Sequence, residues 1–237
     1  MSNTMTSALA VFPDATTLAE SAASLVADSL SDAVSVRGWA SLVVPGGRTP
    51  AQFLSCLSTA VLPWDRVSVT LTDERWVGLD DAGSNEAMVR RNLLTAFARR
   101  AQLVPLYTGE SSPAEGIASV DRALGAFDDA FDMVVLGMGE DGHIASLFPG
   151  EPTWPQPAEG IAAGQFCVPA IGIPGGPERI SLTLGRLVNA RSIVVLATGE
   201  SKRRLWEDME AGGPSASLPI GALQASVRCP LTVLWCP

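Results

Sequence analysis

The segment Phe131-Asp-Met-Val-Val-Leu-Gly-Met-Gly-Glu-Asp-Gly-His-Ile-Ala-Ser-Leu-Phe-Pro149 predicts a buried strand that ends in a glycine-rich turn. Residues 133–136 are apolar, as in a strand inside a sheet, and the glycines that follow let the backbone approach a small ligand. The turn carries Asp141 and His143, the only histidine of the chain. Open parallel sheets bind ligands beyond the carboxyl ends of their strands, so we expect the chemistry of this protein here.

A second turn of the same kind, Val195-Leu-Ala-Thr-Gly-Glu-Ser-Lys202, holds the only lysine. Here too an apolar strand passes through a glycine into a predicted helix. The other fifteen of the sixteen basic residues are arginine, so this single lysine indicates a position that needs a compact ammonium group. Lys202 is therefore a second candidate site residue.

The rest of the chain alternates short β-rich runs with longer amphipathic stretches, which predicts an α/β fold: a mostly parallel sheet with helices on both faces. The expected strands are residues 39–44, 67–72, 133–136, 166–168, 180–184, 193–197 and 231–234. The expected helices are residues 15–31, 50–60, 85–98, 114–124 and 201–210.

The length of 237 residues and the 47% apolar composition are compatible with a single domain over residues 1–237. Residues 1–8 are expected to fray, as unanchored termini do. The stretch 149–177 is rich in Pro and Gly and has no helical period. We expect a long excursion around one short strand there, and a lid is one hypothesis for it.

Charge and cysteine usage exclude several function classes. The net charge is −9 and the basic residues are scattered, which argues against nucleic acid or an anionic membrane as partner. The first arginine is Arg37, so no basic segment of a signal peptide is present, and no apolar run has the length of a membrane span. Cys56, Cys167, Cys229 and Cys236 form no Cys-x-x-Cys motif. These features predict a soluble cytoplasmic protein.

The end of the first long predicted strand, Val44-Pro-Gly-Gly-Arg-Thr-Pro50, has the composition of a phosphate-binding loop. Gly46 and Gly47 allow backbone N–H groups to turn inward, Thr49 can cap the next helix, and Pro50 suits its first position. Backbone donors and the positive end of a helix dipole favour a bound phosphate. A tight turn without a ligand is the alternative.

The next strand end, Thr70-Leu-Thr-Asp-Glu-Arg-Trp76, places three charged side chains directly after an apolar run. A solvated loop would explain them, but they emerge at the edge where a ligand would lie. We therefore expect Asp73 and Arg75 to be functional and Glu74 to be structural.

The glycines of Gly137-Met-Gly-Glu-Asp-Gly142 also match the Gly-x-Gly-x-x-Gly pattern of dinucleotide-binding turns. The strand before them lies in the middle of the chain, and no acidic residue ends a strand about twenty residues later. This position argues against a nucleotide site. A histidine that only satisfies its neighbours is the other alternative for His143.

Five motifs, in order, resemble the signature of the 6-phosphogluconolactonase family: Ser41–Pro50, Thr72–Val77 with Ser84-Asn85, Gly137–Pro149, Arg179–Thr183 and Thr198–Lys202. The resemblance covers most of residues 41–206 and implies a Rossmann-like fold shared with glucosamine-6-phosphate deaminases. It implies hydrolysis of 6-phospho-D-glucono-1,5-lactone to 6-phospho-D-gluconate in the oxidative pentose phosphate pathway, by a monomer without metal or nucleotide cofactor. The chain departs from the family at Gly78, where proline is frequent, and in its Leu-Trp-Cys-Pro237 end.

Hydrolysis of a lactone requires a positioned water, a base and stabilisation of charge on the carbonyl oxygen. His143 suits the general base because histidine is largely neutral near pH 7, and Asp141 or Asp73 could orient its ring. Arg75 is the candidate for binding the oxyanion or the sugar hydroxyls. The candidate phosphate ligands are Gly46, Gly47, Arg48, Thr49, Arg179 and Lys202.

Two alternatives from other function classes stay open at this point. A glucosamine-6-phosphate deaminase would share the fold and the Asp-Gly-His turn, but that family resembles Phe-Asn-Glu-Pro after its histidine, where this chain has Ser146-Leu-Phe-Pro149. The glutamate of that motif helps to open the sugar ring, so its absence argues against deamination. A non-catalytic sugar-phosphate sensor would need an output segment, and the sequence has no helix-turn-helix or basic patch to supply one.

Overall fold

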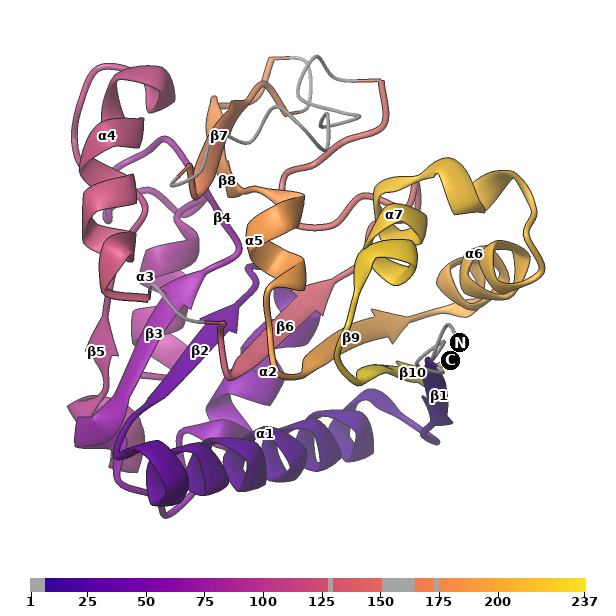
Figure 1. Cartoon of the computed structure of the whole chain (residues 1–237), viewed down its shortest axis with the longest axis horizontal. Helices are drawn as coiled ribbons and strands as arrows, with labels where there is room; N and C mark the ends of the chain where they lie inside the picture. The colour runs from indigo at the N-terminus through magenta and orange to yellow at the C-terminus, as the bar shows by residue number, and fades with distance from the viewer. Residues whose placement is uncertain (1–6, 128–129, 151–164, 173–174) are drawn as a thin grey trace.

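The centre of the molecule is a seven-stranded sheet (Figure 1). The computed structural model describes residues 7–127, 130–150, 165–172 and 175–237. The strands run in the order β1-β10-β9-β6-β2-β3-β5, and every adjacent pair is parallel. Their bounds are β1 Ala8–Val11, β2 Ala40–Val44, β3 Val67–Leu71, β5 Gln102–Leu103, β6 Met133–Gly137, β9 Ile193–Thr198 and β10 Leu231–Cys236. The predicted α/β class is confirmed.

The central strands are buried because the sheet is covered on both sides. All of β2 is buried, as are all residues of β6 and β9 except the last of each. Strands enclosed in this way have continuous rather than alternating apolar sequences, which is the signal used to predict them. Buried apolar side chains from both sheets of the molecule join in one core cluster.

The helices lie on both faces of the parallel sheet. The helices form two groups according to the strands that they connect. Each helix of the first group leads to a strand nearer β5, and each helix of the second group leads to a strand nearer β1. Crossovers between parallel strands are right-handed, so the groups cover opposite faces, and Figure 1 shows α5 in front of the strands with α2 behind them. The first group is α1 Ala15–Arg37, α2 Arg48–Leu57 and α3 Asn85–Asn92; the second is α4 Pro113–Leu124, α5 Leu184–Val188, α6 Glu200–Glu210 and α7 Pro219–Ser226.

Two of the predicted strands do not belong to the parallel sheet. The strands expected at 166–168 and 180–184 are β7 (Cys167–Ala170) and β8 (Arg179–Leu182), which form a small antiparallel sheet with β4 (Asp73–Arg75). Thr72 joins the two sheets, because its N–H donates to Val44 O and its carbonyl accepts from Leu182 N, both at 2.9 Å. The hydrophobic period predicts a strand but not its partner.

Several boundaries also differ from those expected. The helix expected at 85–98 ends at Asn92, and Ala96 has a left-handed φ of 41° before a short 3-10 turn at Ala96–Arg100. The other 3-10 turns are Trp64–Arg66, Gly125–Phe127 and Pro214–Ser217. Five of the described helices and strands were not expected at all: β1, β4, β5, α5 and α7. All five are short, and α7 has little amphipathic character to reveal it.

The two segments predicted to be irregular lie partly outside the described residues. Ala8 opens β1 and pairs with Thr232, so the expectation of fraying is wrong for Ala8, while residues 1–6 lie outside the described ranges. Within the expected excursion, β7 is the short strand, but residues 151–164 and 173–174 are not described, and the lid hypothesis falls on them.

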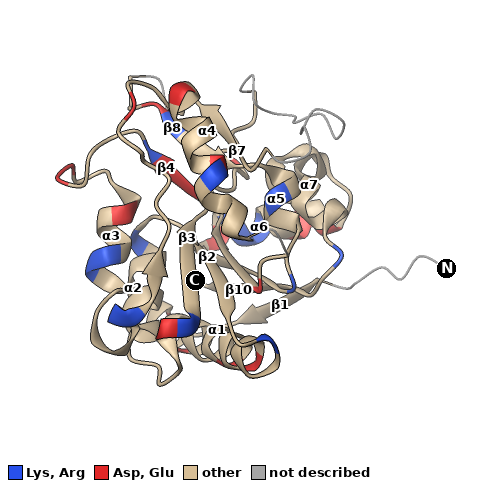
Figure 2. Ribbon diagram, turned by 60° about the vertical axis from the view of Figure 1, so that its left-hand side comes forward, with Lys and Arg blue, Asp and Glu red and all other residues tan. Residues whose placement is uncertain are grey.

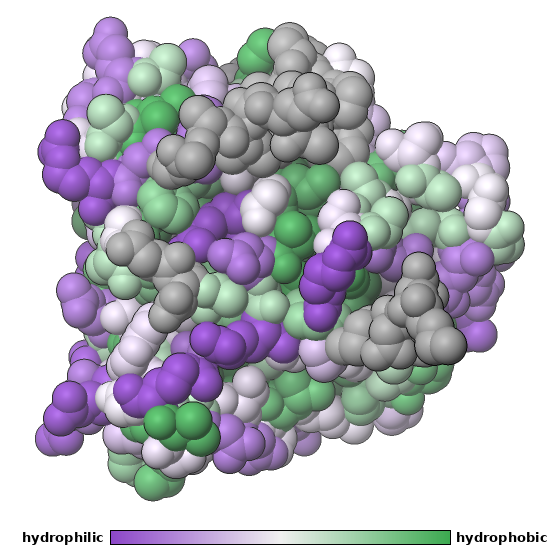
Figure 3. All heavy atoms as spheres, viewed as in Figure 1, coloured by the Kyte–Doolittle hydropathy of each residue, from purple (hydrophilic) through white to green (hydrophobic). Residues whose placement is uncertain are grey.

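The drawn surface mixes positive with negative residues and hydrophilic with hydrophobic ones (Figure 2, Figure 3). Lys and Arg are spread over several elements together with Asp and Glu (Figure 2), and hydrophilic and hydrophobic residues are interspersed over the face drawn in Figure 3. Among the described helices, none is both long and apolar enough to cross a bilayer.

Candidate active site

A cavity of about 450 Å³ opens at the carboxyl ends of the central strands and brings together nine of the ten predicted site residues. Asp141 does not line it but contacts His143, which does. The lining predicted residues are Gly46, Gly47, Arg48, Thr49, Asp73, Arg75, His143, Arg179 and Lys202. A second hollow of about 510 Å³ lies at the amino-terminal end of β3, around Trp64 and Phe97, away from all of these residues.

His143 is held by its own turn. Its Nδ1 lies 2.6 Å from Asp141 Oδ1, and its backbone N–H donates to the same oxygen at 3.2 Å. Partial burial acts to raise the pKa of Asp141, but the neighbouring His143 charge and hydrogen bonds outweigh it, so this pKa lies below its ordinary value. Gly139 is required here, because a Cβ at that position would overlap the imidazole.

Phe148 packs against the ring of this histidine. Its ring centroid lies 4.6 Å from that of His143, with the planes tilted by 44°. The Arg179 guanidinium lies 5.5 Å from the same ring, close enough for a cation–π interaction. The turn thus supplies both a carboxylate and an apolar wall for the imidazole, and Phe148 is a site residue that the sequence analysis did not identify.

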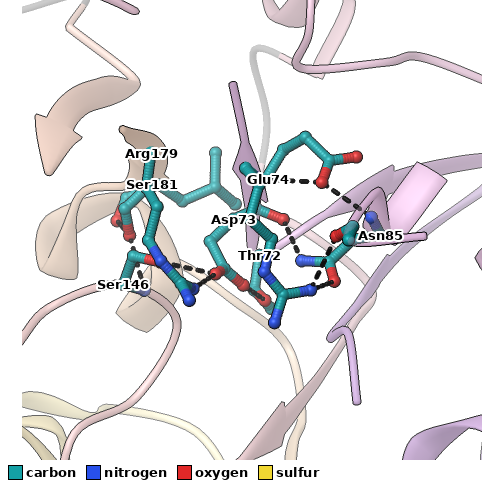
Figure 4. Close-up of polar contacts among 10 residues, drawn as sticks. Thr72, Asp73, Glu74, Asn85, Ser146, Arg179 and Ser181 are labelled. Atoms are coloured by element: carbon teal, nitrogen blue, oxygen red, sulfur yellow. Dashed lines mark hydrogen bonds and ion pairs between the residues drawn. The ribbon is translucent and has the colours of Figure 1, made fainter. Parts of the chain in front are cut away.

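Asp73 does not reach His143 but belongs to a buried network of side chains (Figure 4). Its Oδ1 accepts from Thr72 Oγ1 at 2.8 Å, and its Oδ2 accepts from Ser146 Oγ at 2.5 Å. Arg179 Nη1 lies 3.2 Å from Ser146 Oγ and 3.6 Å from Asp73 Oδ2. Of the two carboxylates considered for orienting the imidazole, Asp141 is therefore the one in contact with it.

Arg75 is fixed by the loop before α3. Its Nη1 donates to Gly83 O at 3.0 Å and to Asn85 Oδ1, while Asn85 Nδ2 donates to Asp73 O at 2.9 Å. The Asn85 amide also lies against Gly46, where a Cβ would overlap it. Asn85 therefore connects the Asp73 strand, Arg75 and the glycine loop, a role that the Ser84-Asn85 motif did not reveal by itself.

Glu74 has the structural position expected for it. It is fully buried, and its carboxylate accepts from the backbone N–H groups of Asn85 at 2.7 Å and Glu86 at 2.6 Å, at the start of α3. Burial raises the pKa of Glu74, an effect that these backbone hydrogen bonds partly offset. The carboxylate thus caps α3, and it also accepts from the backbone N–H of Arg75 at 2.8 Å.

Two helices begin at the cavity, on either side of the His143 turn, because β6 lies between β2 and β9. α2 starts after Gly47, with φ 108°, and α6 after Gly199, with φ 91°. Thr49 was expected to cap α2 and Pro50 to open it, and both expectations are wrong because the helix already begins at Arg48. The N-cap residue of each helix is a glycine, which has no side chain to accept from the first N–H groups, so both positive helix ends stay directed at the cavity.

Lys202 is in the first turn of α6 and half-buried at the cavity wall. Burial lowers the pKa of its ammonium group, and the neighbouring Glu140 opposes that shift. Glu140 also lines the cavity and accepts from Ser201 Oγ at 3.4 Å. No three His, Cys, Asp or Glu side chains come together as a metal site within the described ranges.

An open parallel sheet with a cavity at the carboxyl ends of its strands defines an α/β protein of the class that binds small molecules at this edge. The family described as glucosamine-6-phosphate isomerases/6-phosphogluconolactonase matches residues 13–234, and the chain belongs to this family.

Individual relatives agree with this membership. The chain is similar to 6-phosphogluconolactonase of Mesorhizobium japonicum, 39% identical over 226 residues that cover 95% of this chain and 94% of the relative. It is 36% identical to 6-phosphogluconolactonase of Pseudomonas putida, with 94% and 90% covered. A crystal structure of a 6-phosphogluconolactonase from Shewanella baltica covers 99% of both chains at 33% identity, with a TM-score of 0.91. The family and the Rossmann-like fold predicted from the motifs are confirmed.

Proposed function

We propose that this protein is a carboxylic ester hydrolase that converts 6-phospho-D-glucono-1,5-lactone to 6-phospho-D-gluconate, in the oxidative pentose phosphate pathway. The observation that carries the proposal is the His143–Asp141 pair at 2.6 Å beside a cavity lined by Arg75, Arg179 and Lys202. A base and several cations are what an anionic ester substrate requires. The relatives named 6-phosphogluconolactonase support the assignment.

In the proposed reaction His143 acts as general base. With Asp141 on Nδ1, the Nε2 atom takes a proton from water as the water oxygen attacks the lactone carbonyl carbon. The tetrahedral intermediate then breaks its bond to the ring oxygen, which receives the proton back from the imidazolium. Asp141 stabilises the imidazolium formed between these steps, and no covalent enzyme intermediate is required.

Arg75 is proposed to stabilise the negative charge that develops on the carbonyl oxygen, or to bind the sugar hydroxyls. Its guanidinium is fixed by two acceptors, Gly83 O and Asn85 Oδ1, so little reorganisation accompanies binding. Asp73, whose carboxylate oxygens both accept from hydroxyl groups, is assigned to supporting Arg179 rather than to acting as a base.

The phosphate is proposed to lie between the starts of α2 and α6. Lys202 and the loop residues Gly46, Gly47, Arg48 and Thr49 line that part of the cavity, and Arg179 lines the same cavity as a further candidate ligand. Helix starts favour anions, and a local group of cations stands out on a chain with net charge −9.

The proposal includes a monomeric cytoplasmic enzyme that needs no metal or nucleotide. All four cysteines are free thiols, which agrees with a reducing compartment.

The deciding experiment is a rapid acid-release assay on freshly generated 6-phosphogluconolactone, with the unaided hydrolysis in the same buffer subtracted. We expect a rate far above buffer. A rate equal to buffer, or release of ammonia from glucosamine 6-phosphate, would overturn the assignment; the second result would place the protein on the deaminase side of its family.

A further inference from the structure

Ser146 links Arg179 to Asp73 in the buried network of side chains (Figure 4). Its side chain is 0% exposed, and its hydroxyl has one proton, which it donates to Asp73 Oδ2 at 2.5 Å. An arginine can only donate, so the contact from Arg179 Nη1 at 3.2 Å uses an oxygen lone pair of Ser146. The direction of both hydrogen bonds is therefore fixed by chemistry.

This hydroxyl joins three segments that are far apart in the chain. Asp73 belongs to β4, Arg179 belongs to β8, and Ser146 is in the turn that also carries His143. Arg179 and Asp73 are 3.6 Å apart, longer than a direct hydrogen bond, and Thr72 already donates to the other carboxylate oxygen. The Ser146 hydroxyl thus bridges the Asp73 carboxylate and the Arg179 guanidinium and keeps them from forming a direct hydrogen bond.

We propose that Ser146 is a positioning residue that holds the Arg179 guanidinium at the cavity wall, an inference that rests on the proposed function. Without the hydroxyl, Arg179 would close the gap to Asp73 and form a direct, charge-assisted pair. The carboxylate would then neutralise the Arg179 charge, which would be displaced from its position at the cavity wall. Ser146 acts through Arg179 and touches no reacting atom, so its loss affects substrate capture more than the chemical step.

The test is a double-mutant cycle of Ser146→Ala and Arg179→Ala, read as KM and kcat for 6-phosphogluconolactone and as Kd for 6-phosphogluconate by calorimetry. We expect Ser146→Ala to raise KM and Kd about tenfold, the loss typical of a hydrogen bond to a charged group, with kcat nearly unchanged. In the Arg179→Ala background the same change should raise neither value further, since the residue it positions is gone.

Ser41→Ala provides the matched control. Ser41 is also buried, its hydroxyl donates to Asp132 Oδ2 at 3.1 Å, and that aspartate is also paired with arginine, through Arg37 and Arg191. This second group of serine, aspartate and arginine lies at the amino-terminal ends of the strands, away from the cavity. Ser41→Ala should lower the melting temperature and leave KM unchanged.

If Ser146→Ala does not fold, Ser146→Cys replaces it in the cycle, because a thiol is a weak hydrogen-bond donor of similar size.

Two results would overturn the positioning role. One is an equal change in KM for the Ser146 and Ser41 variants. The other is a double variant in which the Ser146 and Arg179 effects on KM multiply. A wild-type protein that binds 6-phosphogluconate without hydrolysing the lactone would instead overturn the proposed function, and the Kd cycle would still decide the role of Ser146.

Discussion

Replacing Lys202 by alanine should separate substrate capture from chemistry. The lysine is half-buried in the first turn of α6, where the helix start already favours an anion. A charge-assisted hydrogen bond to phosphate contributes about 1.5–3 kcal/mol, which corresponds to a rise in KM of about 10- to 150-fold. The phosphate is remote from the carbonyl, so kcat should change much less. Because plain glucono-δ-lactone has no phosphate, its hydrolysis should be almost unaffected.

The assay is kcat/KM for both lactones with wild type, Lys202→Ala and Lys202→Arg. The arginine variant should recover only part of the preference for the phosphorylated lactone, because a planar guanidinium does not replace a compact ammonium. Arg204→Ala removes a positive charge from the exposed face of the same helix and controls for the change in net charge. If Lys202→Ala keeps the full wild-type preference, Lys202 is not a phosphate ligand and Arg179 or Arg48 takes that role.

Three further predictions concern the catalytic turn and the glycine loop. His143→Ala should lower kcat about 10²–10⁴-fold in the acid-release assay while still binding 6-phosphogluconate, and the wild-type rate should fall on the acid side of its pH profile; near-normal turnover would move the base elsewhere. The pKa of Asp141 is lowered in the folded state, so its contribution to stability is present above about pH 4 and lost as the pH falls further. The melting temperatures of wild type and Asp141→Asn should therefore converge as the pH falls below about 4, and a constant difference would contradict the pairing with His143. Gly46→Ala would push the Asn85 amide away from Arg75 and should cost about 10²-fold in kcat/KM, whereas Gly78→Ala, with open space around it, should match wild type.

The sequence alone determined the α/β class, the main buried strands and long helices, and most of the site, because those signals are local. An apolar run that stops at a glycine predicts a strand end whatever lies beside it, as at Leu136-Gly137 and Thr198-Gly199. Strand ends of a parallel sheet meet at one edge, so the residues that follow them could be grouped before any contact was known. This reasoning placed His143, Asp73 and Lys202 around one cavity.

Only the tertiary structure decided which partner each of these groups has. The pairing of β4 with β8 and the choice of Asp141 rather than Asp73 for His143 depend on how distant segments pack, and no periodicity encodes that. Ser146 shows the reason most clearly, since a small polar residue between the apolar pairs Ile144-Ala145 and Leu147-Phe148 carries no signal of its own. Its role arises from a hydrogen bond to a residue 73 positions away, and buried polar groups acquire such partners only when the chain has folded.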